Sequence, residues 1–412
     1  MRKTDRLIEY ATLDCGMRLV HVHTPGAATA IAGVTARVGS RDDATDAHGL
    51  AHLVEHTIFK GTKRRSPWHI INRMEAVGGE LNAFTTKEET TVYSIYPAGN
   101  TARAAELIAD LVQNSQFPAK ELEKERQVIA DEIDSYLDSP ADAVYDDFDE
   151  LLFDGSPLGH NILGSREDIA RITPELCRAY LRQYYTAPNM VAFYSGPESI
   201  GRVAAVFSRH MQPSAEEVVH TPLTQPSVAP FDVRRRIDSH QDHNLMGARL
   251  PDMYHPSRFS VALLTNILGG PGMNSLLNVA LRERRGLVYT VEASSTWSSD
   301  CGAFTVYFGC DPDDSARCRR LVQECIGRIA AGDAITERAL EMAKRQYLGQ
   351  LIVASDNREN SILGIARATL FHGRASLPAE TTEHIRSVSL ADITQAASRL
   401  TSLSTLTLGP GL

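Results

Sequence analysis

The stretch His52-Leu53-Val54-Glu55-His56 decides how the rest of the chain is interpreted. On a helix, His52 and His56 are four residues apart and project from one face, with Glu55 beside them. Two imidazoles at this spacing can bind one zinc ion, and Glu55 can meet a water at that ion. The order is the reverse of His-Glu-x-x-His and is typical of one class of zinc peptidases. An amphipathic helix whose polar face carries these residues for no functional reason is the alternative.

A third metal ligand is expected on a charged helix further along the chain. A catalytic zinc usually has three protein ligands and one open position. The stretch 119–137 offers four glutamates, Glu121, Glu123, Glu125 and Glu132. Glu125 and Glu132 are two helical turns apart and share a face, so one can bind the metal while the other orients a histidine. A solvated acidic helix is the alternative.

Composition excludes several classes of protein. The chain has 412 residues, enough for two or three domains, and a net charge of −9, which argues against a nucleic-acid binder. The short basic clusters at 60–65 and 234–236 are interpreted as solvated turns and linkers. No apolar run is long enough for a membrane helix, and no secretory signal is visible. Six cysteines without a C-x-x-C pair predict reduced, buried thiols in a cytoplasmic protein.

The two halves of the chain resemble each other. Thr91-Val92-Tyr93 recurs as Thr305-Val306-Tyr307, and each copy precedes a helix with an apolar stripe. We therefore predict two duplicated α+β domains, 1–212 and 233–412, joined by a proline-containing linker at 213–232. The two tripeptides are 214 residues apart. At this spacing His52, His56, Glu125 and Glu132 correspond to residues that do not replace them as ligands: Asn266, Gly270, Ala339 and Gln346. The second domain is thus expected to bind substrate.

The local pattern predicts mostly antiparallel sheets with helices on one face. Strand-like stretches cover 30–38 and 81–96, and helices are expected at 47–60, 101–113 and 119–137. The stretch around Asn82, Ala83 and Phe84 is expected to offer a strand edge on which an extended peptide can pair.

Taken together, these motifs resemble those of the pitrilysin/insulinase family of zinc metallopeptidases. The likeness is to its smaller two-domain members, which are related to mitochondrial processing peptidase. It covers nearly the whole chain. The blocks that carry it are Gly39–Arg41, Gly49–His56 with Phe59–Thr62, Gly78–Gly79 with Asn82–Ala83, Thr90–Tyr93, Leu158–Gly159, Leu163–Gly164, Tyr185 with Asn189–Met190, and Leu281–Tyr289.

The resemblance implies a role for each of these site residues. It implies one zinc per chain on His52, His56 and Glu132, which follows His56 by the spacing of the family's third ligand. It implies Glu55 as the catalytic base and Glu125 as a supporting carboxylate. It also implies that the second domain supplies Arg282 and Tyr289 to the substrate, with the two domains closing as a clam-shell.

The expected function is a zinc-dependent endopeptidase that hydrolyses peptides or unfolded segments, with a water activated by Glu55 at the zinc. A homodimer is expected, and a heterodimer is possible; no nucleic-acid or membrane partner is expected. The alternatives are a non-catalytic or partner-dependent subunit of a processing-peptidase-like complex, and a zinc-dependent binding module.

Overall fold

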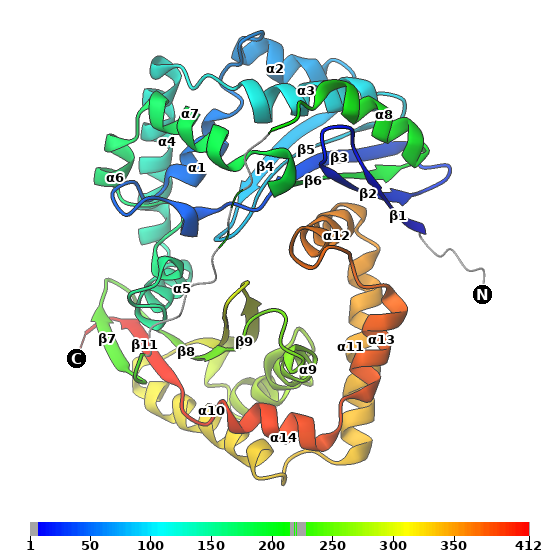
Figure 1. Ribbon diagram of the computed structural model, residues 1–412. Helices are drawn as coiled ribbons and strands as arrows, with labels where there is room; N and C mark the ends of the chain where they lie inside the picture. Colours follow the sequence, from blue (N-terminus) through cyan, green and yellow to red (C-terminus); the bar gives the residue numbers. More distant parts are fainter. Residues whose placement is uncertain (1–6, 215–217, 219, 221–227, 412) are drawn as a thin grey trace. The chain divides into compact units, whose positions relative to one another are not determined.

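A computed structural model describes residues 7–214, 218, 220 and 228–411, which form two compact units. The first unit comprises Met1–Ile133, His160–Thr221 and Ala354–Ala375, and the second comprises Asp134–Gly159, Pro222–Val353 and Ser376–Leu412. Each unit holds one sheet and its helices (Figure 1). The linker expected at 213–232 lies mostly outside the described residues, and the domain limits at 212 and 233 stay a prediction.

The sheet of the first unit has six strands in the order β1-β2-β6-β3-β5-β4. Adjacent strands are antiparallel except β2 and β6, which are parallel. Strand β4 is an edge strand, so one side of its backbone has no strand partner in this sheet. The strands are β1 (Leu7–Thr12), β2 (Arg18–His23), β3 (Thr29–Ala36), β4 (Glu80–Thr85), β5 (Thr90–Pro97) and β6 (Met190–Gly196).

Helices cover both faces of this sheet (Figure 1). Along β3, Ala30, Ala32 and Val34 pack into the core formed with most of the helices, whereas the buried Ile31 points to the other face. Helix α12 (Arg358–His372) covers that second face. The prediction of helices on one face is therefore incomplete. The remaining helices of the unit are α1 (Leu50–Thr57), α2 (Pro67–Glu75), α3 (Thr101–Asn114), α4 (Ala119–Leu137), α6 (Arg166–Arg171), α7 (Pro174–Tyr184) and α8 (Ile200–His210).

The second unit repeats this plan with five strands in the order β7-β11-β8-β10-β9. Strands β7 and β11 are parallel and the other neighbours antiparallel. The strands are β7 (Asp232–Arg236), β8 (Asp242–Leu250), β9 (Val288–Trp297), β10 (Gly302–Cys310) and β11 (Ser404–Gly409). The helices are α5 (Pro140–Leu152), α9 (Arg258–Gly269), η4 (Asn278–Glu283), α10 (Ser315–Ala330), α11 (Glu337–Ser355), α13 (Pro378–Ser387) and α14 (Leu390–Ser398).

Alternating residues of β10 separate the two cores of the second unit. Phe304, Val306 and Phe308 pack with α9, α10 and α14, whereas Ala303 packs with α5 through a cluster that includes Phe148. This alternation is what a strand covered on both faces requires.

The matching strand orders confirm the predicted duplication. The order β2-β6-β3-β5-β4 corresponds to β7-β11-β8-β10-β9, including the parallel pair in each. The repeated tripeptides lie in β5 and β10, which hold the same place in the two sheets. Helix α5, which follows α4, belongs to the second unit, and α12, which follows α11, belongs to the first. Each sequence half thus contributes one helix to the other half's unit.

The helix predicted at 119–137 is confirmed as α4, with the same bounds. The strand-like stretch predicted at 81–96 forms the hairpin β4–β5. The helix expected at 47–60 is shorter, spanning Leu50–Thr57. None of the described helices combines the length and apolar character needed to cross a bilayer. The six cysteines are free, and five of them are buried.

Candidate metal centre

Helix α1 carries the two histidines, and the half-buried carboxylate of Asp43 fixes its start. Its apolar residues, Leu50, Ala51, Leu53 and Val54, are buried, which leaves the opposite side to the polar residues of the motif. The carboxylate of Asp43 accepts hydrogen bonds from the backbone N–H groups of Gly49 and Ala51, both at 2.9 Å. An anion at a helix N-terminus satisfies its free N–H groups and interacts favourably with the helix dipole.

Two glycines allow the loops around this helix start to touch. Gly49 has a φ of 86°, and a Cβ there would lie 2.4 Å from the carbonyl oxygen of Leu163. Gly164 has a φ of 70°, and its Cβ would lie 2.3 Å from the carbonyl oxygen of His48. Both positions therefore need glycine for conformation and for space.

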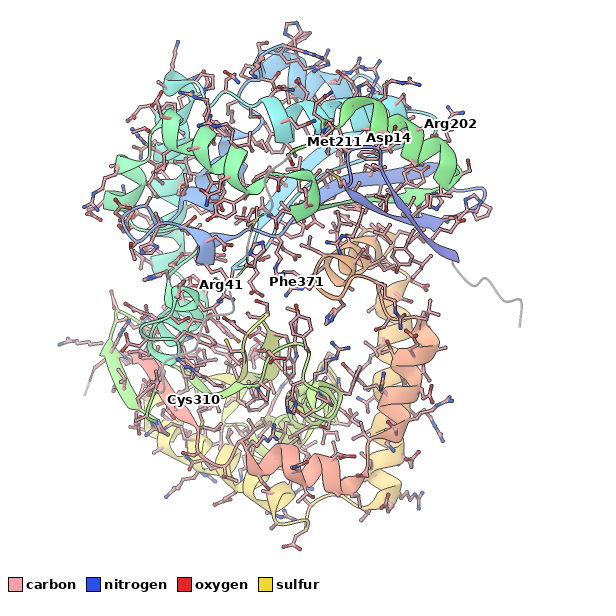
Figure 2. The ribbon with its side chains drawn as sticks, in the orientation of Figure 1. Asp14, Arg41, Arg202, Met211, Cys310 and Phe371 are labelled. Atoms are coloured by element: carbon pink, nitrogen blue, oxygen red, sulfur yellow. The ribbon has the colours of Figure 1, made fainter. Side chains whose placement is uncertain are left out.

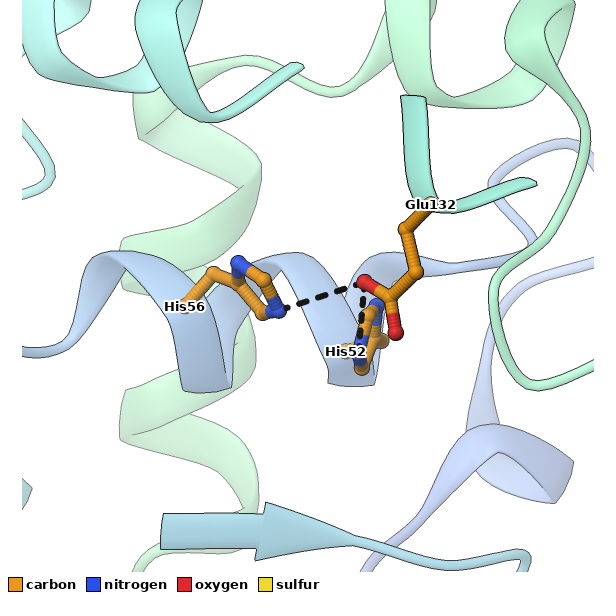
Figure 3. Close-up of side chains that lie close together, drawn as sticks. All are labelled: His52, His56 and Glu132. Atoms are coloured by element: carbon orange, nitrogen blue, oxygen red, sulfur yellow. Dashed lines mark ion pairs between the residues drawn. The ribbon is translucent and has the colours of Figure 1, made fainter. Parts of the chain in front are cut away.

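Helix α4 brings two of its four candidate glutamates to α1. Glu132 Oε2 lies 3.9 Å from His52 Nε2 and 3.7 Å from His56 Nε2 (Figure 3). Glu125 is buried, and its Oε2 lies 3.3 Å from His56 Nδ1. Its Oε1 lies 2.8 Å from Lys60 Nζ. Glu121 and Glu123 instead pair with Lys124 and Arg126 on their own helix.

The geometry of His52, His56 and Glu132 fits a metal ion. Their ligand atoms all lie within 4.8 Å of one another, and this is the one such group of three among the described residues. Ligands at the usual zinc distances in a tetrahedron are about 3.4 Å apart. The distances from Glu132 to the two histidines, 3.7 and 3.9 Å, are a few tenths of an ångström longer. Two imidazole nitrogens with one carboxylate oxygen is a ligand set that zinc accepts.

Burial and nearby charges shift the pKa values of His52 and Glu55. Burial, with the neighbouring His56, lowers the pKa of His52 to about 3, so its ring is neutral and offers a lone pair. Burial raises the pKa of Glu55, an effect to which Glu132 adds, whereas His56 and a hydrogen bond with Thr85 oppose it. Glu55 Oε2 lies 3.9 Å from His52 Nε2, so the carboxylate faces the candidate metal position.

Strand β4 lies beside α1, and Thr85 at its end reaches Glu55. The residues expected to bind substrate, Asn82, Ala83 and Phe84, lie on this edge strand and are half-buried. A peptide pairing with the free edge of β4 would therefore run next to the helix that carries the histidines.

Arg282 and Tyr289 lie in the second unit and line one cavity there. The guanidinium carbon of Arg282 is 5.8 Å from the ring centroid of Tyr289, whose side chain is 82% exposed. The cavity has a volume of about 390 Å³, and its wall includes the glycine-rich run at 269–272 and part of the edge strand β9.

In the second unit, amide side chains of α9 and of the turn after it bond to amides of α11, where the sequence repeat places the counterparts of the candidate ligands. Asn266 on α9 donates from Nδ2 to Oε1 of Gln350 on α11, at 2.7 Å. Asn274 donates in the same way to Gln346, at 2.8 Å. The region that corresponds to the candidate metal centre is therefore held by neutral hydrogen bonds.

Several residues that support the centre cannot be identified from the sequence. Asp43 and Thr85 carry no motif signal, because their partners are distant in sequence. The basic cluster at 60–65 was interpreted as solvated, which is wrong for two of its members. Lys60 pairs with Glu125, and Arg65, only 16% exposed, pairs with Glu106 and Asp110. Nothing in a run of basic residues distinguishes a paired cation from a solvated one.

Two family models match the chain. The model for insulinase, peptidase family M16, matches residues 18–166, and the model for the peptidase M16 inactive domain matches residues 171–347. The first match contains all the residues of the candidate centre. The second covers much of the half in which the described residues form no candidate metal group.

Similar proteins span nearly the whole chain. An uncharacterized zinc protease from Mycobacterium leprae is 31% identical over 94% of this chain and 88% of its own. A probable mitochondrial-processing peptidase subunit beta from Schizosaccharomyces pombe is 28% identical over 95% of this chain and 88% of its own. The crystal structure of a protease from Helicobacter pylori has the same fold, with a TM-score of 0.91, 21% identity and coverage of 98% and 100%.

Proposed function

Because the chain belongs to the insulinase family of peptidases, family M16, we propose that it is a zinc-dependent endopeptidase acting on peptides or unfolded segments. The observation that carries this proposal is the convergence of His52, His56 and Glu132, with Glu55 beside them. His52, His56 and Glu132 would hold one zinc ion per chain. When bound, zinc would polarise the scissile carbonyl and lower the pKa of water at the site.

Glu55 transfers the proton of the attacking water, and Glu125 and Lys60 support the site. Glu55 accepts a proton from the attacking water and then donates it to the leaving amine. Its raised pKa suits this exchange, because a carboxylate with a raised pKa is a stronger base. Glu125 accepts the N–H of His56 at Nδ1, which leaves Nε2 of that ring as the metal-binding atom. Lys60 holds Glu125 in place through its ion pair.

Substrate binding is assigned to both units. In the first, Asn82, Ala83 and Phe84 pair with an extended peptide along the free edge of β4. In the second, Arg282 and Tyr289 contact the substrate, and Tyr289 donates a hydrogen bond to the developing oxyanion. The cavity that both residues line supports a binding role for this part of the second unit.

A partner-dependent subunit is the second candidate. It is favoured by the similarity to a relative named as subunit beta of a processing peptidase. A homodimer is the form we propose, because this chain carries both the candidate ligands and the proposed substrate pair. Peptide cleavage by the purified single chain would decide against the partner-dependent candidate.

The proposed activity is tested with a Glu55→Gln variant. Metal analysis and hydrolysis of a mixed set of quenched peptides are measured for the wild type, with and without a chelator, and for the variant. We expect one zinc per chain in both proteins and hydrolysis only in the untreated wild type. Undiminished cleavage by the variant would exclude Glu55 as the base. Stoichiometric zinc without any turnover in the wild type would indicate a binding module.

A further inference from the structure

We propose that the first unit binds a small phosphate-type oxyanion in a pocket outside the candidate metal centre. The pocket has a volume of about 140 Å³. Its described lining contains two arginines and a histidine but no aspartate or glutamate: Arg18, Arg37, Pro188, Asn189, Val218, His220 and Leu370. A partly buried pocket with this excess of positive charge favours the binding of an anion.

The structure holds Arg18 in a fixed orientation. Its guanidinium donates to the carbonyl oxygens of Thr369 and Leu370, at 2.8 and 3.4 Å, in the last turn of α12. Those contacts use only part of its five N–H donors. The remaining donors are available to a ligand in the pocket that Arg18 lines.

Arg37 is the second cation of the pocket. Among the described acidic groups, Asp42 lies close enough for the charge of Arg37 to oppose the rise that burial causes in the pKa of Asp42. Its guanidinium carbon lies 5.4 Å from the ring centroid of Phe371, which is labelled on α12 in Figure 2. Within the part of the chain that the structure describes, its side chain makes no ion pair. Burial lowers the pKa of Arg18, and the positive charge of Arg37 lowers it further, which shows that the two cations repel each other. The nearby Arg41 differs, because it pairs with Glu88 at 2.6 Å.

Asn189 and His220 complete a polar wall. Asn189 Nδ2 donates to the carbonyl oxygens of Arg37 and Tyr184, so its Oδ1 is an acceptor. His220 Nε2 lies 2.7 Å from that oxygen and therefore carries the proton. The ring of His220 is thus oriented by a side chain that is itself fixed by two backbone groups.

The arrangement favours phosphate over a single carboxylate. Two guanidiniums, one from strand β2 and one from the residue that follows β3, line one small space. Each presents a planar set of donors that matches phosphate oxygens. A dianion neutralises both cations, whereas a carboxylate neutralises one. The proposal is independent of the peptidase assignment, because none of the lining residues is one of its site residues.

The test uses the full-length protein and inorganic phosphate as the probe. Calorimetric titration and thermal unfolding are measured with phosphate, acetate and chloride at equal ionic strength. We expect saturable binding of phosphate and a rise in Tm that chloride does not produce. Acetate binding as tightly as phosphate, or no saturable binding of phosphate, would overturn the proposal.

Variants locate the binding. Arg37→Gln should weaken phosphate affinity by about tenfold or more, because one charge-assisted contact is lost. Arg37→Lys keeps the positive charge but not the planar guanidinium. Its phosphate affinity should lie between that of Arg37→Gln and that of the wild type. The matched control is Arg202→Gln on α8 (Figure 2), whose side chain is 68% exposed and pairs with Glu198. Equal phosphate affinity in Arg37→Gln and Arg202→Gln, with both folded by circular dichroism, would refute the site.

Discussion

At the scale of single residues, a chain of contacts runs from Lys60 through Glu125 to His56. Lys60 Nζ lies 2.8 Å from one oxygen of Glu125, and the other oxygen lies 3.3 Å from His56 Nδ1. A carboxylate behind a ligating histidine fixes the ring and increases its basicity. The contact between α1 and α4 thus includes a carboxylate that would act on a bound metal only through His56.

Glu125→Gln should therefore weaken zinc binding without abolishing it. We expect a loss of zinc affinity of about 10- to 100-fold, measured by competition with a chromophoric chelator. Glu123→Gln is the matched control, because Glu123 lies on the same helix with its side chain 72% exposed. Unchanged zinc affinity in Glu125→Gln would contradict the supporting role.

A second prediction at this scale concerns pH. Burial, followed by the charges of Arg37 and Arg41, lowers the pKa of His220 from 6.5 to about 4. Between these values the unfolded state binds more protons than the folded state, so the free energy of unfolding falls as the pH falls. His220→Gln should lessen this fall. Denaturant titrations between these pH values measure the free energy of unfolding of the wild type, of His220→Gln and of the control His240→Gln, whose histidine is exposed. Identical dependence on pH in the two variants would contradict the prediction.

The candidate metal ligands are easier to identify from the sequence than the residues that support them. The spacing of His52 and His56 on one helix is a local property, and it is visible in the chain. Glu132 was one of four glutamates on its helix, and the choice depended on the family resemblance. Lys60 and Thr85 act through partners on other elements, so no local pattern identifies them.

At the scale of elements, the start of α1 depends on a close approach of two loops. Gly49→Ala should be strongly destabilising, because it adds a Cβ 2.4 Å from a carbonyl oxygen at a φ of 86°. Gly16→Ala is a matched control: Gly16 has the same φ, but nothing lies within 4 Å of its Cβ. The control isolates the cost of the backbone conformation, about 1 kcal/mol.

We expect Gly49→Ala to lower the free energy of unfolding by about 2 kcal/mol more than Gly16→Ala, and to reduce zinc content as well. Chemical denaturation and metal analysis of both variants provide the comparison. Equal destabilisation by the two substitutions would mean that the loops at Gly49 and Leu163 adjust freely.

Elements were predicted more reliably than their partners. The helix at 119–137 and the hairpin within 81–96 follow from local periodicity and from glycine and proline positions. Periodicity shows that a helix has an apolar face but does not show which sheet that face covers. For this reason α5 and α12 were not assigned to the units in which they pack.

At the scale of the whole molecule, the first unit needs a helix from the second half of the sequence. Helix α12 covers the face of the sheet on which Val20, Ile31 and Phe193 are buried. A fragment comprising residues 1–212 should therefore expose apolar surface and aggregate, although it contains all the candidate metal ligands. Binding of an apolar dye measures the exposed surface, and sedimentation measures aggregation, in the fragment and in the whole chain. A fragment that is monomeric and unfolds cooperatively would contradict the prediction.

The two units are expected to have different tasks, metal binding in the first and substrate binding in the second. The described residues of the second unit include no group of candidate metal ligands, but Arg282 and Tyr289 line a cavity there. Substitutions of these two residues should therefore change hydrolysis and leave zinc content unchanged. We expect Arg282→Ala and Tyr289→Phe each to lower kcat/KM by about tenfold or more, because each removes a hydrogen bond to bound substrate. Arg284→Ala, an exposed neighbour outside the cavity lining, is the control. Loss of zinc in either variant, or activity equal to the control, would mean that the second unit supports the first without touching the substrate.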